Sequence, residues 1–162
     1  MKTVTLVRHG KSSWEYDVSD IERPLKSRGK NDAKLVANQY IKSNSTPKNI
    51  YTSPANRALS TCGIFVDVFR LSDNSYTIIG DLYDFGGENV IKFIKTLPDT
   101  VDNIMIFGHN HAFTSIVNIY GDKFIDNLPT SGLVKLNFDI SNWKDLKKGT
   151  TELIIIPKEL KK

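Results

Sequence analysis

Hydrophobic positions along the chain follow two alternating patterns. Short runs of apolar and β-branched residues occupy positions 3–7, 49–52 and 103–107. Each run is followed by a polar or glycine-containing junction. A stretch in which apolar residues recur at helical spacing comes next. The first and last runs are nearly continuous, as expected for strands that are covered on both faces. The pattern therefore predicts a strand–helix repeat with a parallel central sheet.

Four segments have the amphipathic spacing of helices. Apolar residues recur at helical intervals within 24–43 and again within 55–69. Two shorter helices are expected over 88–97, ended by a proline, and over 111–120, ended by a glycine.

The C-terminal part departs from this repeat. Two strand-like runs, Gly132–Phe138 and Glu152–Ile156, are joined by a polar stretch at 142–149 without a convincing crossover helix. Such a connection favours an antiparallel pair. The sequence contains no internal repeat, low-complexity segment or linker-like change of composition. We therefore expect one domain over residues 1–162, a three-layer α/β/α sandwich whose mostly parallel sheet ends in an antiparallel C-terminal strand pair.

Composition supports a globular protein. The chain has 162 residues, of which 40% are hydrophobic and 25% charged, so disordered, collagen-like and solenoid proteins are not indicated. Its start, MKTVTLVRHG, is typical of a first strand, because the short β-branched run lacks the cleavage site of a signal peptide. No apolar run is long enough to cross a membrane. A cytoplasmic protein without membrane contact is expected.

Charge and cysteine content narrow the function further. The 22 basic and 18 acidic residues leave a net charge of +4, and the basic residues form no patch interleaved with aromatic residues, so nucleic acid is not an expected partner. The single cysteine, Cys62, excludes an internal disulfide and a cysteine-based zinc site. Its place on the apolar face of a helix favours inert packing.

Arginines and histidines gather where three predicted strands end. The junctions are Arg8-His9-Gly10, Ser53-Pro54-Ala55-Asn56-Arg57 and Gly108-His109-Asn110. Because ligands of open α/β sheets bind outside the carboxyl ends of the strands, these junctions are expected to meet in one crevice. Two arginines and two histidines there suit a phosphoryl group, since guanidinium forks match its oxygens in charge and geometry.

Each residue of this set has a candidate role. Arg8 and Arg57 are expected to bind phosphate. Ser53 before Pro54 indicates a helix start with Ser53 as the capping residue, and this start places Arg57 in an opening turn that also favours anions. His9 is the candidate nucleophile, since a neutral ring nitrogen can attack phosphorus when the other nitrogen is held as a donor. His109 is expected to hydrogen-bond a phosphoryl oxygen, and no metal is required.

Simpler explanations exist for single residues. Arg57 is otherwise a solvated helix arginine, and His109 a histidine at a strand end. His109 and His111 could also suggest a metal pair, but their i, i+2 spacing differs from the i, i+4 spacing of the helical zinc motif. For His111, a partly exposed position in the first turn of a helix is the favoured interpretation.

With these residues the chain resembles the histidine phosphatase superfamily, in which an Arg-His-Gly motif after the first strand supplies a transiently phosphorylated histidine. The similarity runs in the order of its small SixA-like branch through Arg8-His9-Gly10-Lys11-Ser12-Ser13-Trp14, Arg23-Pro24-Leu25, Arg28-Gly29, Asp32-Ala33, Thr52-Ser53-Pro54, Arg57-Ala58, Gly108-His109-Asn110 and Pro129-Thr130-Ser131-Gly132.

The resemblance implies a phosphohistidine phosphatase-like enzyme without a cofactor. It implies a phosphate pocket formed by Arg8, His9, Arg57 and His109. Arg23 is expected at the rim of this pocket. It also implies an open pocket, because longer insertions cover the pocket in the phosphoglycerate mutase-like members.

Two features near the expected pocket remain open. Many phosphatases of the superfamily use an acidic residue to protonate the leaving oxygen, and Asp84, with Glu88 just beyond, is the candidate here; an exposed turn residue is the alternative for Asp84. Trp14 and Tyr16 either form an aromatic edge of the pocket or pack in the interior.

Three functions follow from these observations. The first is a metal-independent phosphatase that acts through a phosphohistidine intermediate on His9, with phosphohistidine in a signalling protein as its substrate. The second is a phosphomonoesterase for small metabolites. The third is a catalytically silent module that binds phosphorylated ligands, against which the presence of His9 argues. The expected partner is a phosphorylated protein or a small phosphorylated substrate. The oligomeric state does not follow from the sequence.

Overall fold

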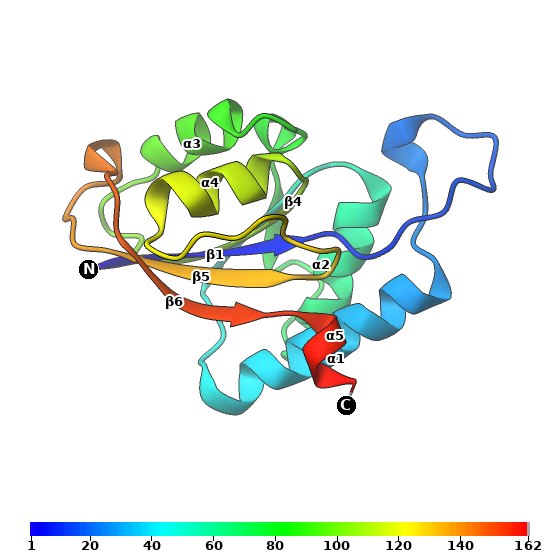
Figure 1. Ribbon diagram of the computed structural model, residues 1–162. Helices are drawn as coiled ribbons and strands as arrows, with labels where there is room; N and C mark the ends of the chain where they lie inside the picture. Colours follow the sequence, from blue (N-terminus) through cyan, green and yellow to red (C-terminus); the bar gives the residue numbers. More distant parts are fainter. Residues whose placement is uncertain (162) are drawn as a thin grey trace.

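The protein, described here from a computed structural model over residues 1–161, is built on a six-stranded mixed sheet (Figure 1). The strands are β1 (Lys2–Arg8), β2 (Asn49–Thr52), β3 (Tyr76–Ile78), β4 (Asn103–Gly108), β5 (Leu133–Phe138) and β6 (Thr150–Ile155). Their order across the sheet is β3-β2-β4-β1-β5-β6. The first four strands in this order pair in parallel, whereas β5 runs antiparallel to both β1 and β6.

Helices cover both faces of the sheet. In Figure 1, α3 and α4 lie above the sheet, and α1 and α5 lie below it. Helix α2 shares one hydrophobic core with α1 and so covers the same face as α1. The helices are α1 (Ser27–Ser43), α2 (Asn56–Val68), α3 (Glu88–Lys95), α4 (Ala112–Tyr120) and α5 (Pro157–Leu160). Three short 3-10 helices lie in the connecting segments: η1 (Asp20–Glu22), η2 (Gly80–Leu82) and η3 (Trp143–Asp145). The predicted three-layer fold is thereby confirmed.

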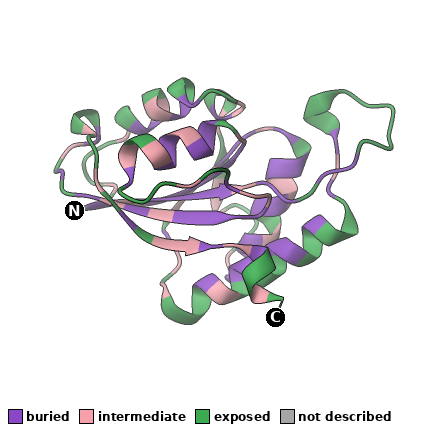
Figure 2. Ribbon diagram, in the orientation of Figure 1, coloured by how far each residue is buried: buried purple, intermediate pink, exposed green. Residues whose placement is uncertain are grey.

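Two hydrophobic cores explain the continuous apolar runs. Alternate side chains of a strand point to opposite faces, so Ile104 and Ile106 pack under α3 and α4, while Met105 and Phe107 pack against α1 and α2. These four side chains are fully buried. The central strands are largely purple, the colour of buried residues, in Figure 2. A strand buried on both faces has no polar side to alternate with, and this explains why β1 and β4 were predictable as strands.

The structure also contains elements that the pattern does not indicate. The edge strand β3 has only three residues, and its side chains are partly or fully exposed, so it lacks an apolar signature. Helix α5 is a single turn that starts at a proline. The C-terminal strand pair is not a separate hairpin, because β5 also pairs with β1 and extends the same sheet. Helix α2 begins at Asn56, three residues after the expected Ser53 cap.

The segment between β1 and α1, residues 9–26, leaves the carboxyl end of β1 and extends beyond the sheet (Figure 1). Its outer part, which includes η1, is mostly exposed (Figure 2). Within residues 1–161, no helix has the length and apolar character needed to span a membrane.

Candidate active site

Strand register brings the three junctions together. In the parallel pair of β1 and β4, Arg8 lies opposite Gly108, and the backbone N–H of His9 donates to the carbonyl oxygen of Gly108 at 3.0 Å. On the other side of β4, the N–H of Ser53 donates to the carbonyl oxygen of Phe107 at 3.0 Å. The His9 and His109 side chains consequently face each other, with ring centroids 5.3 Å apart.

A pocket of about 340 Å³ opens at this end of the sheet. This volume is at the lower end of the range of small-molecule sites. The pocket combines three arginines with aromatic and polar side chains; its lining residues are Arg8, His9, Lys11, Ser12, Trp14, Asp20, Arg23, Arg57, Phe85, Asn110 and Thr130. Among residues 1–161, no three His, Cys, Asp or Glu side chains are grouped closely enough to hold a metal ion.

The ring of His9 is held in one tautomer. Its Nδ1 lies 2.8 Å from the carbonyl oxygen of Gly10, which can only accept, so Nδ1 carries the proton. Its Nε2 accepts a hydrogen bond from Nε of Arg57 at 3.4 Å. Burial, together with the neighbouring arginines, lowers the pKa of His9 to about 4. His9 is therefore neutral near pH 7, with its lone pair on Nε2 directed into the arginine cluster.

Two glycines fix the loop that carries His9. A Cβ atom on Gly10 would lie only 2.8 Å from the carbonyl oxygen of Gly29, and a Cβ atom on Gly29 would collide with the backbone of Lys11. The N–H of Gly10 also donates to Oγ1 of Thr61 at 2.9 Å. The loop thus packs directly against the start of α1 and the first turns of α2, so the position of His9 is set by backbone contacts.

Arg8 supplies a half-buried cation at the pocket. Its Nη1 donates to the carbonyl oxygen of Leu128 at 2.8 Å, while its buried Nε has no hydrogen-bond partner within the described chain. Burial and the nearby Arg57 lower the pKa of Arg8, but a guanidinium stays protonated near neutral pH. A donor without a partner in a pocket lined by cations suits an anionic ligand.

Arg57 is bound by Asp20, a residue that the sequence analysis did not single out. Nη1 of Arg57 donates to the backbone oxygen of Asp20 at 2.6 Å, and Nη2 donates to its Oδ2 at 2.9 Å. The Asp20 carboxylate also accepts from Nη1 of Arg23 at 3.2 Å and from the hydroxyl of Tyr83. Desolvation raises the pKa of Asp20, but hydrogen bonds from Tyr83, Arg57 and Arg23 outweigh it and hold this pKa at about 2.

His109 lies behind the pocket lining and is fully buried. Its Nε2 is 2.8 Å from Oγ of Ser53, whose oxygen already accepts from the N–H of Ala55 at 3.2 Å. The Ser53 hydroxyl is free to donate to Nε2, and in that arrangement the ring proton lies on Nδ1. That Nδ1 atom is buried and has no partner among the described residues. Burial and the charges of His9 and Arg57 lower the pKa of His109 to about 3, so the ring is neutral.

The expected role of Ser53 as a helix cap is wrong. Helix α2 has Ala55 at its N-cap position, without a side-chain cap, and the Ser53 hydroxyl contacts His109 instead. Arg57 nevertheless lies in the opening turn of α2, where the sequence placed it, and it is buried rather than solvated.

Asp84 holds the start of α3. Its Oδ2 accepts backbone hydrogen bonds from Gly87, Asn89 and Val90 at 3.0–3.1 Å, and its Oδ1 accepts one from Gly86 at 3.1 Å. Asp84 is not among the residues that line the pocket, and Glu88 is exposed at the first position of α3. These contacts account for Asp84 as a capping residue, whereas its role as an acid stays a prediction.

The aromatic residues after the His9 loop are exposed. Trp14 lies at the pocket with 76% of its surface accessible, and its ring stacks 3.2 Å from the guanidinium carbon of Arg23. Tyr16 is also exposed but does not line this pocket. Arg23 itself is buried and lines the pocket. Trp14 therefore forms an aromatic edge of the pocket. The alternative prediction, that this ring packs in the interior, is wrong.

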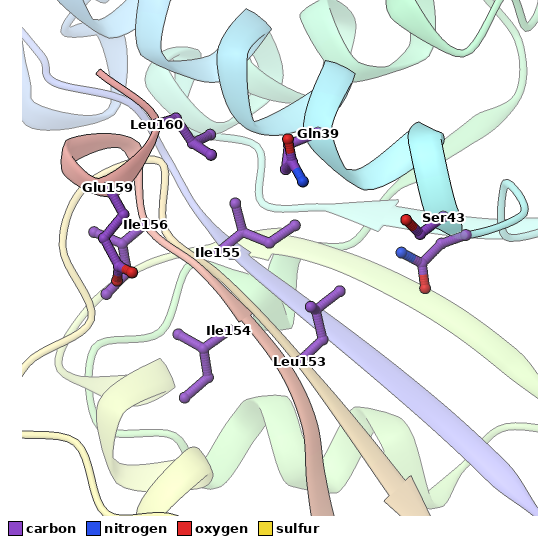
Figure 3. A pocket seen from close by; sticks show the side chains of 9 residues that line it. Gln39, Ser43, Leu153, Ile154, Ile155, Ile156, Glu159 and Leu160 are labelled. Carbon is purple, nitrogen blue, oxygen red and sulfur yellow. The ribbon is translucent and has the colours of Figure 1, made fainter. Parts of the chain in front are cut away.

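Two other residues named in the sequence analysis, Cys62 and His111, do not line the pocket at His9. Cys62 is fully buried in the core beside α1, and burial raises its pKa to about 12. His111 is exposed, two residues beyond His109. Another hollow lies between α1, β6 and α5 (Figure 3). Its lining within the described chain includes one ionisable side chain, Glu159, so it lacks the arginine and histidine combination.

Sequence reasoning missed Asp20, Tyr83 and Phe85. Asp20 and Tyr83 stand in connecting segments without periodicity, and no spacing signals that they meet. Of these three residues, Phe85 is the one that the sequence could have indicated as a site residue. A large aromatic residue in a polar, glycine-rich turn is unusual.

Comparisons with known proteins show what this chain is similar to. The model of the histidine phosphatase superfamily (branch 1) matches residues 4–77, which contain Arg8, His9, Arg23 and Arg57. A 2,3-bisphosphoglycerate-dependent phosphoglycerate mutase of Hydrogenobaculum sp. is 34% identical over 74 residues, which are 44% of this chain and 30% of the mutase. The chain thus matches less than a third of that relative. An uncharacterized protein of Mycobacterium tuberculosis is 25% identical over 91% of this chain and 96% of its own length.

Solved structures extend the similarity of fold to nearly the whole chain. The protein histidine phosphatase SixA, solved with tungstate, has a TM-score of 0.82 and 21% identity, over 98% of this chain and 99% of its own. A SixA protein from Agrobacterium tumefaciens has a TM-score of 0.79 and 22% identity, over 96% and 99%. The resemblance to the histidine phosphatase superfamily is therefore confirmed, by the family model over residues 4–77 and by a SixA-like fold over almost the entire chain.

Proposed function

We propose that this protein is a phosphatase that removes phosphoryl groups through a covalent phosphohistidine intermediate on His9. The observation that carries the proposal is the state of the His9 ring. Its Nδ1 proton is held by the Gly10 carbonyl, and its neutral Nε2 faces a cluster of arginines. The tungstate in the SixA structure supports an anionic ligand for this fold, because tungstate is a tetrahedral oxyanion like phosphate.

In the first step, the lone pair on Nε2 of His9 attacks phosphorus. The bond between phosphorus and the leaving atom breaks, and its electron pair stays on the leaving atom, which takes up a proton from solvent. Arg8, Arg23 and Arg57 balance the charge on the phosphoryl oxygens, and the Nδ1–H of His109 donates a hydrogen bond to one of them. The phosphorylated ring of His9 keeps its Nδ1 proton on the Gly10 carbonyl.

In the second step, water attacks the phosphorus of the intermediate. The bond from phosphorus to Nε2 breaks, its electron pair returns to the ring, and the water gives up a proton to solvent. Inorganic phosphate leaves, and His9 regains its neutral form. Both steps use the chain's own residues, so the proposed reaction is metal-independent.

Phosphohistidine is the proposed substrate group, presented by a protein in the cytoplasm. Asp84 is engaged at the start of α3, and an imidazole leaving group needs less protonation than an alkoxide. A phosphomonoesterase for small metabolites is the alternative within the same chemistry.

The test is phosphate release from phosphoramidate, phosphohistidine and p-nitrophenyl phosphate, measured with a metal chelator present. Wild type and the matched control His111→Ala are expected to turn over, whereas His9→Ala is expected to lose activity by about four orders of magnitude or more. A much faster reaction with p-nitrophenyl phosphate than with phosphohistidine, which also carries a ring, would favour the phosphomonoesterase. No turnover in wild type, combined with stabilisation against heat by tungstate, would show a phosphate-binding module instead.

A further inference from the structure

Two exposed aromatic rings flank the mouth of the phosphate pocket. Trp14 is 76% exposed and Phe85 is 46% exposed, yet both line the same pocket as His9 and Arg57. They come from separate segments, since Trp14 follows β1 and Phe85 lies in the turn before α3. Large aromatic side chains gain little by facing water, so two of them at one opening indicate a ligand that covers them.

Both rings are held in place before any ligand arrives. The Trp14 ring lies against the guanidinium of Arg23, which donates to the backbone oxygen of Ser13 at 3.1 Å and to Asp20 at 3.2 Å. A ring on such a fixed support loses little freedom when it binds a ligand.

Phe85 is held by neighbouring rings. Its centroid is 5.3 Å from that of Tyr83, in an edge-on contact, and 4.9 Å from that of His109. These contacts leave nearly half of the Phe85 surface open at the pocket. Phe85 thus contacts His109 on one side and is open to the pocket on the other.

The direction of attack determines which part of a substrate reaches these rings. A nucleophile and a leaving group lie roughly in line on opposite sides of phosphorus. His9 is 8% exposed, and it therefore attacks from inside the protein. The leaving group consequently points from His9 toward the opening, where the two exposed aromatic side chains lie.

We propose that Trp14 and Phe85 bind the leaving group, and that the preferred substrates carry their phosphoryl group on a planar aromatic ring. Both the imidazole of phosphohistidine and the phenyl ring of an aryl phosphate have this chemistry. The inference rests on the proposed function, because it assigns the substrate class of the same site.

The test compares kcat/KM for three substrates: phosphohistidine, p-nitrophenyl phosphate and phosphoramidate, which has no ring. Trp14→Ala and Phe85→Ala are each expected to lower kcat/KM roughly five- to ten-fold more for a ring-bearing substrate than for phosphoramidate. Trp14→Phe and Phe85→Tyr retain a ring and should restore most of the difference. Phe124→Ala, at an aromatic residue that is 76% exposed but lies outside the pocket lining, is the control.

The pattern of losses decides the outcome. A selective loss with phosphohistidine identifies imidazole as the recognised ring, a selective loss with p-nitrophenyl phosphate identifies phenyl, and either result supports the proposal. Equal losses for all three substrates would overturn it, because Trp14 would then act only through Arg23. No loss for any substrate would overturn it as well.

A binding experiment separates this inference from the proposed function. Phenylphosphonate and methylphosphonate resist hydrolysis, so their affinities are measurable by calorimetry whether or not the protein turns over. Tighter binding of phenylphosphonate that is lost in Phe85→Ala would support ring recognition even in an inactive protein. Equal affinities in wild type would contradict it, although His9-dependent phosphatase activity could still stand.

Discussion

The side chain and backbone of Asp20 together occupy both terminal nitrogens of the Arg57 guanidinium, at 2.9 and 2.6 Å. The third nitrogen, Nε, points to His9 at 3.4 Å. Every nitrogen of this buried guanidinium therefore has a protein acceptor. A phosphoryl group that binds Arg57 has to share these donors with Asp20 or displace it.

Replacing the Asp20 carboxylate is expected to tighten anion binding. Asp20→Asn removes one negative charge from the pocket, so the Kd for tungstate or inorganic phosphate should fall by about ten-fold at low salt. Titration calorimetry measures this change. Glu22→Gln, at an exposed carboxylate that contacts Ser19, serves as the control and should leave the Kd unaltered. Weaker binding in Asp20→Asn would show that Asp20 positions Arg57 more than it competes with the ligand.

The two neutral histidines make the fold sensitive to acid. Their pKa values fall from 6.5 to about 4 for His9 and about 3 for His109, so below pH 6.5 the unfolded chain binds more protons than the folded one. Stability should therefore decrease as the pH falls from 6.5 toward 4, by up to about 2 kcal/mol per histidine between pH 7 and 5. Urea unfolding in phosphate-free buffer at both pH values measures the loss.

A variant isolates the contribution of His109 to this loss. His109→Gln removes one titrating group and should lose less stability on acidification than wild type does. His111→Gln changes an exposed histidine and should behave like wild type. An identical acid response in all three proteins would contradict the assignment of His109 as a buried neutral group.

The hydroxyl of Ser53 is expected to matter for catalysis through His109. Ser53→Ala removes the donor to Nε2, so the Nδ1–H tautomer loses its support and kcat should drop by about ten-fold or more. The imidazole nitrogen shifts of His109, observed by NMR, report the tautomer directly. Ser60→Ala, at a partly exposed position on α2, is the matched control. Unchanged kcat together with unchanged nitrogen shifts would refute this role.

Asp84 can be tested as a cap and as an acid separately. Asp84→Ala removes the acceptor for four backbone N–H groups and should destabilise the fold by about 1 kcal/mol in thermal or urea unfolding. Asp84→Asn should hydrolyse phosphoramidate and p-nitrophenyl phosphate in the wild-type ratio. A selective loss of ester hydrolysis in Asp84→Asn would instead identify Asp84 as the general acid.

The parts of the fold that could be predicted are those whose burial leaves a periodic signature. The runs at 3–7 and 103–107 lie in strands covered on both faces, and the residues directly after them, His9 and His109, could be placed at one sheet edge by topology alone. Strand β3 could not be found, because its three residues gain their order from pairing with β2 and not from a buried face.

The unpredicted parts of the site depend on contacts between irregular segments. Asp20 meets Arg57 because the segment after β1 folds back over the pocket, and nothing in the spacing of that segment encodes the return. Ser53 was assigned by a local rule for helix starts, but a distant partner, His109, determines where its hydroxyl points. Local rules describe a residue correctly only when no buried group competes for it.

The register of β1 and β4 has a consequence for how this protein can change. His9 and His109 extend from adjacent central strands, so the spacing between them is tied to the hydrogen-bonded ladder of the sheet. Trp14 and Asp20 instead stand on a connecting segment at the periphery. Substitutions in that segment can alter selectivity while the distance between the two histidines is preserved. The sheet ladder thus fixes the two histidines of the proposed reaction centre, while Trp14 of the proposed recognition surface lies outside that ladder.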